Sequence, residues 1–147
     1  MTQLTAHFSL EEFTFSQEAA RKGIDNTPPP ELLPKLLILA TKLEDVRNYL
    51  GGSILISSGY RSLALNRSLG SKDTSQHRLG EAVDFTCPRF GSPTNVFHHL
   101  VDSSIEFDQL ILEYPNRNGG WVHISFSSRS RRQVLRIDDL GTHSLQT

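Results

Sequence analysis

The chain of 147 residues is poor in features that several classes of protein require. Cys87 is its only cysteine, which excludes an internal disulfide and a cysteine-based zinc cluster, and we expect it to pack as a small hydrophobe. The formal net charge of −1 gives no electrostatic basis for binding nucleic acid. The longest apolar run, residues 36–40, is far too short to cross a bilayer, so we expect no membrane span.

The rest of the composition is ordinary for a soluble globular protein, with 37% hydrophobic and 21% charged residues. No repeat or low-complexity linker divides the chain. We therefore expect a single domain over residues 1–147, with its core at about 7–137 and a short C-terminal tail. We also expect a monomer. The first residues show no basic run followed by an apolar stretch, which predicts synthesis in the cytoplasm without a signal peptide.

Hydrophobic periodicity and turn residues predict an α+β domain with a mostly antiparallel sheet packed on helices. Ser9 and Glu12 have the spacing of a capping box at the start of the first helix. The expected helices cover about residues 9–22, 31–50, 62–70 and 93–102, and the expected strands cover about residues 53–58, 82–86, 109–114, 121–126 and 133–137.

Two histidines and one aspartate carry the clearest chemical signal. His77 and Asp84 are separated by a short segment with small residues, and His123 follows about forty residues further on. Two imidazoles and one carboxylate form a three-ligand zinc set. Such a set leaves a fourth position open for water, as catalytic rather than structural zinc sites do. The sequence therefore predicts metal-assisted hydrolysis.

Strand alternation tests this set independently, because successive side chains on a strand point to opposite faces. Asp84 and His123 each lie opposite aliphatic and aromatic neighbours on their own strand. If the two strands are neighbours, both side chains converge on one cleft, and the preceding loop brings His77 over it. Each residue also has a simpler interpretation when it is taken alone. His77 would be an exposed loop histidine, Asp84 a charge at a strand edge, and His123 a hydrogen-bonded, half-buried residue. The matching alternation favours the joint site.

The same residues carry a resemblance to a known family. The pattern S-x-H-x-x-G-x-A-x-D runs from Ser75 to Asp84, W-x-H follows at Trp121 and His123, and S-G-Y-R ends at Arg61. With the N-terminal segments H-F-x-L-x-E-F and G-I-D-N-x-P-P-P, the chain resembles the zinc D-Ala-D-Ala carboxypeptidase family of LAS-type metallopeptidases over about residues 7–137. Its opening half resembles the short phage and prophage endolysin-like members of this family. The resemblance implies a fold like that of hedgehog and D-Ala-D-Ala peptidase domains.

By that resemblance, the two histidines and Asp84 hold one zinc per chain. Arg61 would bind a substrate carbonyl or carboxylate and stabilise the developing oxyanion, although a surface salt bridge is the alternative. Ser75 would hydrogen-bond the substrate or the ligand shell, or only cap its own turn. Trp121 would line the substrate groove, or only cover the sheet.

One position departs from the family pattern. Many relatives carry an acid three residues before the last histidine ligand to move a proton from water to the leaving amine, whereas this chain has Gly120 there. Glu113 is our candidate for the general base if its strand pairs with residues 121–126, and the alternative is a solvent-facing glutamate at a strand end. Asp108 is a weaker candidate because it lies an odd number of residues before Glu113, so strand alternation places its side chain on the opposite face from that of Glu113. The basic run at residues 129–132 is expected to be a solvated end rather than a docking surface.

The chain is thus expected to be a zinc peptidase that hydrolyses peptidoglycan stem peptides, as a D-Ala-D-Ala carboxypeptidase or an L-alanyl-D-glutamate endopeptidase. It would act on the cell wall or in the periplasm after phage lysis or another form of delivery. The missing acid at position 120 leaves a second hypothesis open, a non-catalytic zinc-stabilised module that binds the cell wall or a virion component. A weaker third hypothesis keeps the metal chemistry and changes the substrate to an unrelated peptide or amide.

Overall fold

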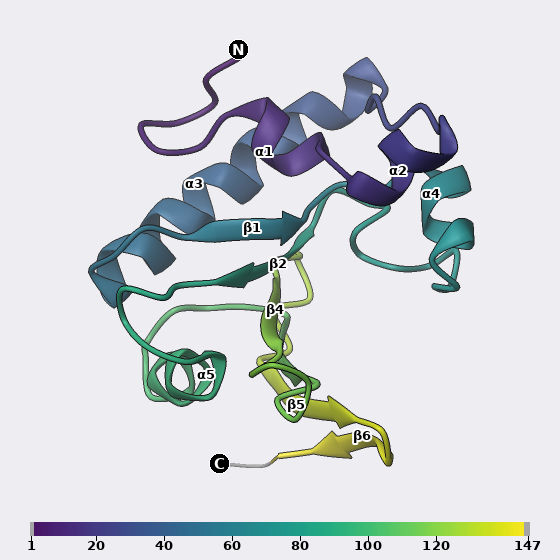
Figure 1. Cartoon of the computed structure of the whole chain (residues 1–147). Coiled ribbons are helices and arrows are strands. Elements are labelled where there is room, and N and C mark those ends of the chain that lie inside the picture. The colour runs from purple at the N-terminus through teal and green to yellow at the C-terminus, as the bar shows by residue number, and fades with distance from the viewer. Residues whose placement is uncertain (1, 146–147) are drawn as a thin grey trace. The chain divides into compact units, whose positions relative to one another are not determined.

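The computed structural model describes residues 2–145, and Figure 1 shows the order of their helices and strands. The helices are α1 (Leu10–Thr14), α2 (Gln17–Lys22), the 3-10 turn η1 (Pro30–Leu32), α3 (Leu33–Leu50), α4 (Leu63–Ser68) and α5 (Pro93–Val101). The strands are β1 (Leu55–Ser58), β2 (Ala82–Thr86), β3 (Gln109–Glu113), β4 (Trp121–Ser125), β5 (Gln133–Asp138) and β6 (Gly141–Ser144). Over the described residues the strands form one six-stranded sheet in the order β1-β2-β4-β3-β5-β6. The predicted α+β class with a mostly antiparallel sheet is confirmed.

The chain divides into two compact units, of which the first takes in the chain as far as Glu44 together with Ile56–Val83. It holds α1, α2, α4 and the larger part of α3. Its apolar centre is formed by side chains that are almost completely buried: Phe8, Phe13, Leu36, Leu39, Leu43 and Leu65. The helix expected over about residues 31–50 is confirmed by α3, whose leucines recur at helical spacing and face this centre.

The predicted helix over residues 9–22 is wrong in one respect, because the structure breaks it into α1 and α2. Ser16 lies between them with an extended backbone, and its hydroxyl accepts a hydrogen bond from the backbone N–H of Ala19 at 3.1 Å. Serine favours such a cap over a helix interior, because its short side chain can satisfy the unpaired N–H groups of a new first turn. Phe15 is left on the corner with 66% of its surface exposed.

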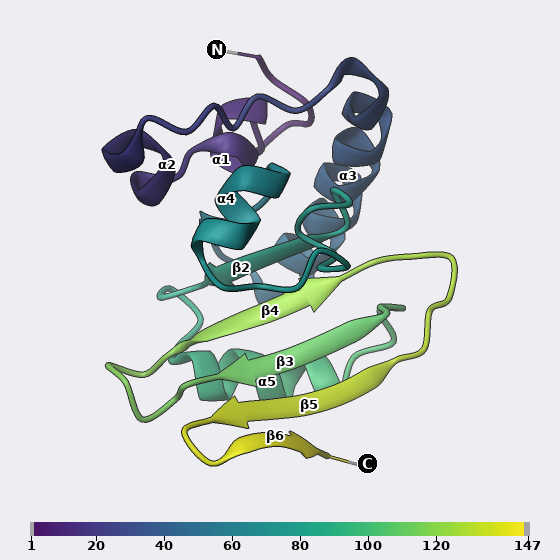
Figure 2. The same ribbon diagram turned by 90° about the vertical axis from the view of Figure 1, so that its right-hand side faces the viewer.

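The second unit takes in Asp45–Leu55 and the chain from Asp84 onward. In Figure 2, β4, β3, β5 and β6 lie side by side with α5 behind them, and α5 contacts β3 and β4. Strands β3 and β4 pair antiparallel, whereas β3 and β5 pair parallel. Strand β6 was not predicted, because all four of its residues are exposed and its sequence shows no apolar alternation.

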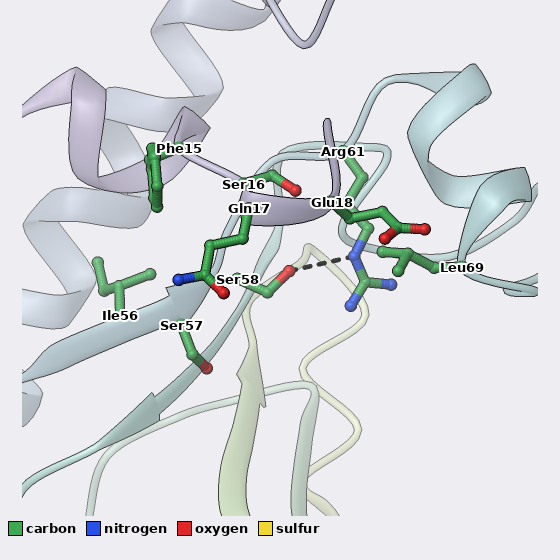
Figure 3. A pocket seen from close by; sticks show the side chains of 9 residues that line it. All are labelled: Phe15, Ser16, Gln17, Glu18, Ile56, Ser57, Ser58, Arg61 and Leu69. Carbon is green, nitrogen blue, oxygen red and sulfur yellow. Dashed lines mark hydrogen bonds between the residues drawn. The ribbon is translucent and has the colours of Figure 1, made fainter. Parts of the chain in front are cut away.

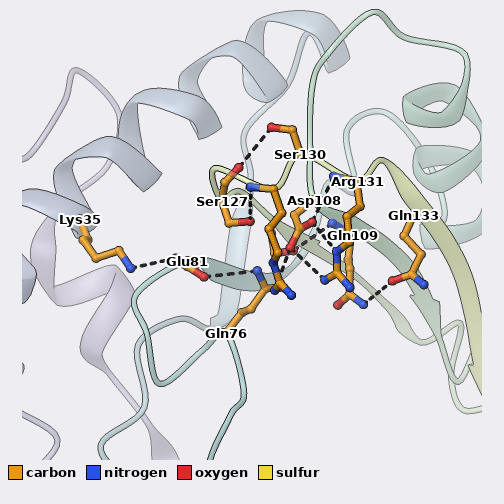
Figure 4. Close-up of polar contacts among 11 residues, drawn as sticks. Lys35, Gln76, Glu81, Asp108, Gln109, Ser127, Ser130, Arg131 and Gln133 are labelled. Carbon is orange, nitrogen blue, oxygen red and sulfur yellow. Dashed lines mark hydrogen bonds and ion pairs between the residues drawn. The ribbon is translucent and has the colours of Figure 1, made fainter.

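The basic segment after β4 is not merely a solvated end, because it packs on a buried acid (Figure 4). Asp108 is fully buried, and its carboxylate oxygens accept hydrogen bonds from Nε of Arg131 at 2.7 Å and from its Nη2 at 3.0 Å. Arg129 lies 3.3 Å from the same carboxylate. The hydrogen bonds that Arg131 donates to Asp108 raise the pKa of Arg131 above its ordinary value. Asp108 therefore anchors the segment that leads into β5.

None of the helices within residues 2–145 combines the length and the apolar character needed to cross a membrane.

Candidate metal centre

His77 is held in one orientation by its own unit. Its side chain is buried, and Nδ1 lies 2.8 Å from the backbone carbonyl oxygen of Gly59. A carbonyl only accepts hydrogen bonds, so Nδ1 must carry the proton and Nε2 is the basic nitrogen. Metal-ligating histidines commonly donate their other ring N–H to a carbonyl in this way. His77 is therefore prepared to ligate through Nε2.

Asp84 and His123 meet on neighbouring strands, as their alternation predicted. Strands β2 and β4 are adjacent in the sheet, and both side chains are 9% exposed. Nδ1 of His123 lies 3.0 Å from Oδ1 of Asp84. This nitrogen is therefore the ring atom of His123 that faces the carboxylate.

His77, Asp84 and His123 form a group that could hold a metal ion. All three are buried, and one ligand atom from each lies within 4.8 Å of the others. Two neutral imidazoles and one carboxylate are a donor set that suits zinc, whose bonds to nitrogen and oxygen are about 2 Å long. The residues present therefore fit the predicted metal.

Glu113 lies beside this group. It ends β3 and pairs in register with Trp121 of β4, and its Oε2 is 3.7 Å from Nδ1 of His123. Its side chain is 17% exposed, so it is not simply a solvent-facing residue at a strand end. Antiparallel pairing thus places an acid next to a candidate ligand without using position 120.

Position 120 could not hold a side chain in this hairpin. Gly120 has a φ of +68°, and a Cβ there would lie 2.1 Å from the carbonyl oxygen of Glu113 and 2.6 Å from that of Tyr114. Both are backbone atoms, which cannot rotate away. The glycine is required by the turn, so its presence is no sign that the site has lost an acid.

Comparison with known protein families now places the chain. A family model described as Peptidase M15 matches residues 6–125, which is most of the sequence. The chain belongs to the Peptidase M15 family. The resemblance to zinc D-Ala-D-Ala carboxypeptidases is thereby confirmed, and membership together with the His77, Asp84 and His123 group supports a zinc peptidase. No curated protein matches the chain.

In this M15 peptidase, Arg61 is the residue predicted to act on the substrate. It lines a hollow of about 490 Å³ in the first unit (Figure 3). Its Nε donates to the hydroxyl of Ser58 at 3.1 Å, and its Nη1 lies 3.2 Å from the hydroxyl of Ser71. The backbone N–H of Arg61 donates to the carbonyl of His77 at 3.1 Å. The arginine and the histidine are thus fixed to each other through the main chain.

Ser75 and Trp121 show contacts that fit the simpler alternatives. The hydroxyl of Ser75 accepts a hydrogen bond from the backbone N–H of His77 at 3.2 Å, so it orders the turn that carries this histidine. The ring of Trp121 packs against Tyr114 with centroids 5.5 Å apart, and Arg117 lies over Tyr114. Roles for Ser75 and Trp121 in binding substrate stay predictions.

Sequence reasoning missed one structural residue near Arg61. The amide of Asn26 donates to the carbonyl oxygens of Thr14 at 2.8 Å and Tyr60 at 3.0 Å, and its Oδ1 accepts from the backbone N–H of Ser62 at 2.7 Å. The signal was its place in the G-I-D-N segment, which the resemblance had already singled out.

Proposed function

We propose that this M15 peptidase hydrolyses peptidoglycan stem peptides at the cell wall, as a monomer that binds one zinc. The bond cut would be D-Ala-D-Ala or L-alanyl-D-glutamate. The observation that carries the proposal is the buried group of His77, Asp84 and His123, found in a chain of a peptidase family. Three protein ligands are typical of catalytic zinc, whereas structural sites use four.

Zinc bound by these three residues would supply a Lewis acid that activates water and polarises a carbonyl. Glu113 would take the proton from the attacking water and pass it to the leaving amine, a role supported by its place beside His123. Arg61 would stabilise the negative charge that develops on the substrate carbonyl oxygen, since a preorganised cation is most effective there.

The first experiment is incubation of the zinc-loaded protein with purified peptidoglycan, followed by mass spectrometry of the released muropeptides. We expect new amino termini or free D-alanine, and the masses identify the bond that is cut. One bound zinc per chain without any cleaved product would instead favour a non-catalytic module that binds the wall. Cleavage only of unrelated peptides would favour a different substrate.

The second experiment replaces Glu113 with glutamine. The substitution keeps the shape of the side chain and removes its basicity, so kcat should fall by about 100- to 10,000-fold. Zinc content should not change, because Glu113 is not among the three proposed ligands. Glu106→Gln is the matched control, because Glu106 is an exposed acid on the same stretch of chain and should keep full activity. Undiminished turnover in Glu113→Gln would remove Glu113 from the mechanism.

A further inference from the structure

The turn that follows β1, residues 59–62, is bonded through its main chain both to His77 and to α1. Toward His77, the carbonyl oxygen of Gly59 accepts from Nδ1 of the imidazole at 2.8 Å. The N–H of Arg61 donates to the carbonyl of His77 at 3.1 Å. These two bonds hold the ring and the backbone of the candidate ligand. Whatever fixes the turn therefore also fixes His77.

Other main-chain groups of the same turn are held against α1. The N–H of Tyr60 donates to the carbonyl of Phe13 at 2.7 Å. A Cβ at Gly59 would lie 2.6 Å from that carbonyl oxygen and 2.9 Å from the Cα of Phe13, so the two main chains are in direct contact. The first half of the turn is thus located by α1.

Asn26 locates the second half of the turn. Its amide nitrogen donates to the carbonyl oxygens of Thr14 at 2.8 Å and Tyr60 at 3.0 Å, and its Oδ1 accepts from the N–H of Ser62 at 2.7 Å. Carbonyls only accept and a backbone N–H only donates, so these partners define a single orientation of the amide. The side chain ties the turn to the end of α1, at the α1–α2 corner (residues 15 and 16).

The segment that carries Asn26 is itself ordered. The backbone N–H of Ile24 donates to the carbonyl of Ala19 in α2 at 2.8 Å. The carboxylate of Asp25 accepts from the backbone N–H of Thr27 at 2.9 Å. The backbone is therefore fixed on both sides of Asn26, and its side chain loses less conformational entropy in making its bonds.

We infer that Asn26 is a positioning residue for the metal centre. By fixing the turn, it keeps the carbonyl of Gly59 where it accepts from Nδ1 of His77, which leaves Nε2 as the nitrogen for the metal. Partners that orient a ligating histidine in this way also set its affinity for the metal. The inference rests on the proposed function for the identity of the metal.

The first test measures the Kd for zinc by competition with a chelator, without any peptide substrate. In Asn26→Ala we expect Kd to rise about tenfold, the lower end of the effect of removing an outer partner, because the Gly59 carbonyl is displaced rather than lost. Glu44→Ala is the control for a general loss of stability. Glu44 holds the N-terminal segment of the same unit through Thr5 and His7, so this variant should keep the wild-type Kd.

Asn26→Asp separates geometry from charge. Aspartate has the size of asparagine and can still accept from Ser62, but it can no longer donate to Thr14 and Tyr60. Its added negative charge would by itself attract a cation, so weaker zinc binding in this variant must come from the displaced turn. We expect its Kd to rise as well. A wild-type Kd in Asn26→Ala would overturn the inference and leave the zinc site and the peptidase intact.

The second test does not depend on zinc. In metal-free protein with isotope-labelled histidine, NMR at a mildly alkaline pH shows which ring nitrogen of His77 carries the proton. We expect a protonated Nδ1 in the wild type and in Glu44→Ala, and faster exchange of this proton or a mixture of tautomers in both Asn26 variants. A wild type that binds no zinc would refute the proposed peptidase, and this measurement would still decide the role of Asn26. Identical His77 signals in all the proteins would overturn it.

Discussion

Gly120→Ala should destabilise the protein far more than Gly119→Ala, although the two glycines are neighbours in one hairpin. Both have a positive φ, +85° at Gly119 and +68° at Gly120, so alanine at either position costs about 1–2 kcal/mol for a left-handed backbone. A Cβ at position 119 meets only Pro93 at 3.8 Å, an ordinary contact. A Cβ at position 120 lies 2.1 Å from the carbonyl oxygen of Glu113, and β3 must move to admit it.

Overpacking of this kind adds about 1–3 kcal/mol, so the loss for Gly120→Ala is about 2–5 kcal/mol. Urea unfolding at neutral pH measures both variants, and equal m values would show that the difference is one of stability. Because Glu113 would shift with β3, we also expect Gly120→Ala to lose activity. A Gly120→Ala variant as stable as Gly119→Ala would refute the claim that the turn excludes an acid from this position.

Three further predictions concern the anchor of the basic segment, the metal and acid sensitivity. Asp108→Asn should lose about 3 kcal/mol of stability in urea unfolding, because it leaves Arg131 without its buried acid, while the exposed Asp139→Asn should change little. Removal of zinc by a chelator should abolish hydrolysis and lower Tm. Zinc at roughly a thousandfold excess over Kd should restore about 4 kcal/mol, whereas a Tm unchanged by zinc would contradict the three-ligand site. Glu18 has a folded pKa of about 2 against an ordinary 4.5, so its contribution to stability is present above pH 4.5 and is lost as pH falls toward 2. The stability gap between wild type and Glu18→Gln should therefore close over that window, and NMR titration of the carboxyl checks the pKa directly.

The sequence predicted most elements because their burial is periodic. Val122 and Ile124 flank His123 on β4, and the alternation of side chains along a strand predicted that His123 lies on the opposite face from these two residues. The structure places Asp84 beside His123, as expected. The break at Ser16 was missed, because a single serine inside an amphipathic pattern does not show whether it caps a new helix. Strand β6 was missed because a fully exposed strand leaves no hydrophobic pattern to read.

By itself the sequence determined the identity and chain order of the candidate ligands, the face of the strand that each ligand on β2 and β4 occupies, and the family. These follow from residue chemistry and local alternation, which need no knowledge of neighbours. Only the tertiary structure decided that Glu113 lies beside His123, that Gly120 has no room for a side chain, and that Asn26 fastens the α1–α2 corner to the Arg61 turn. Each of these depends on which segments pair or pack across long stretches of chain, and strand register and packing are set by the whole fold rather than by local pattern.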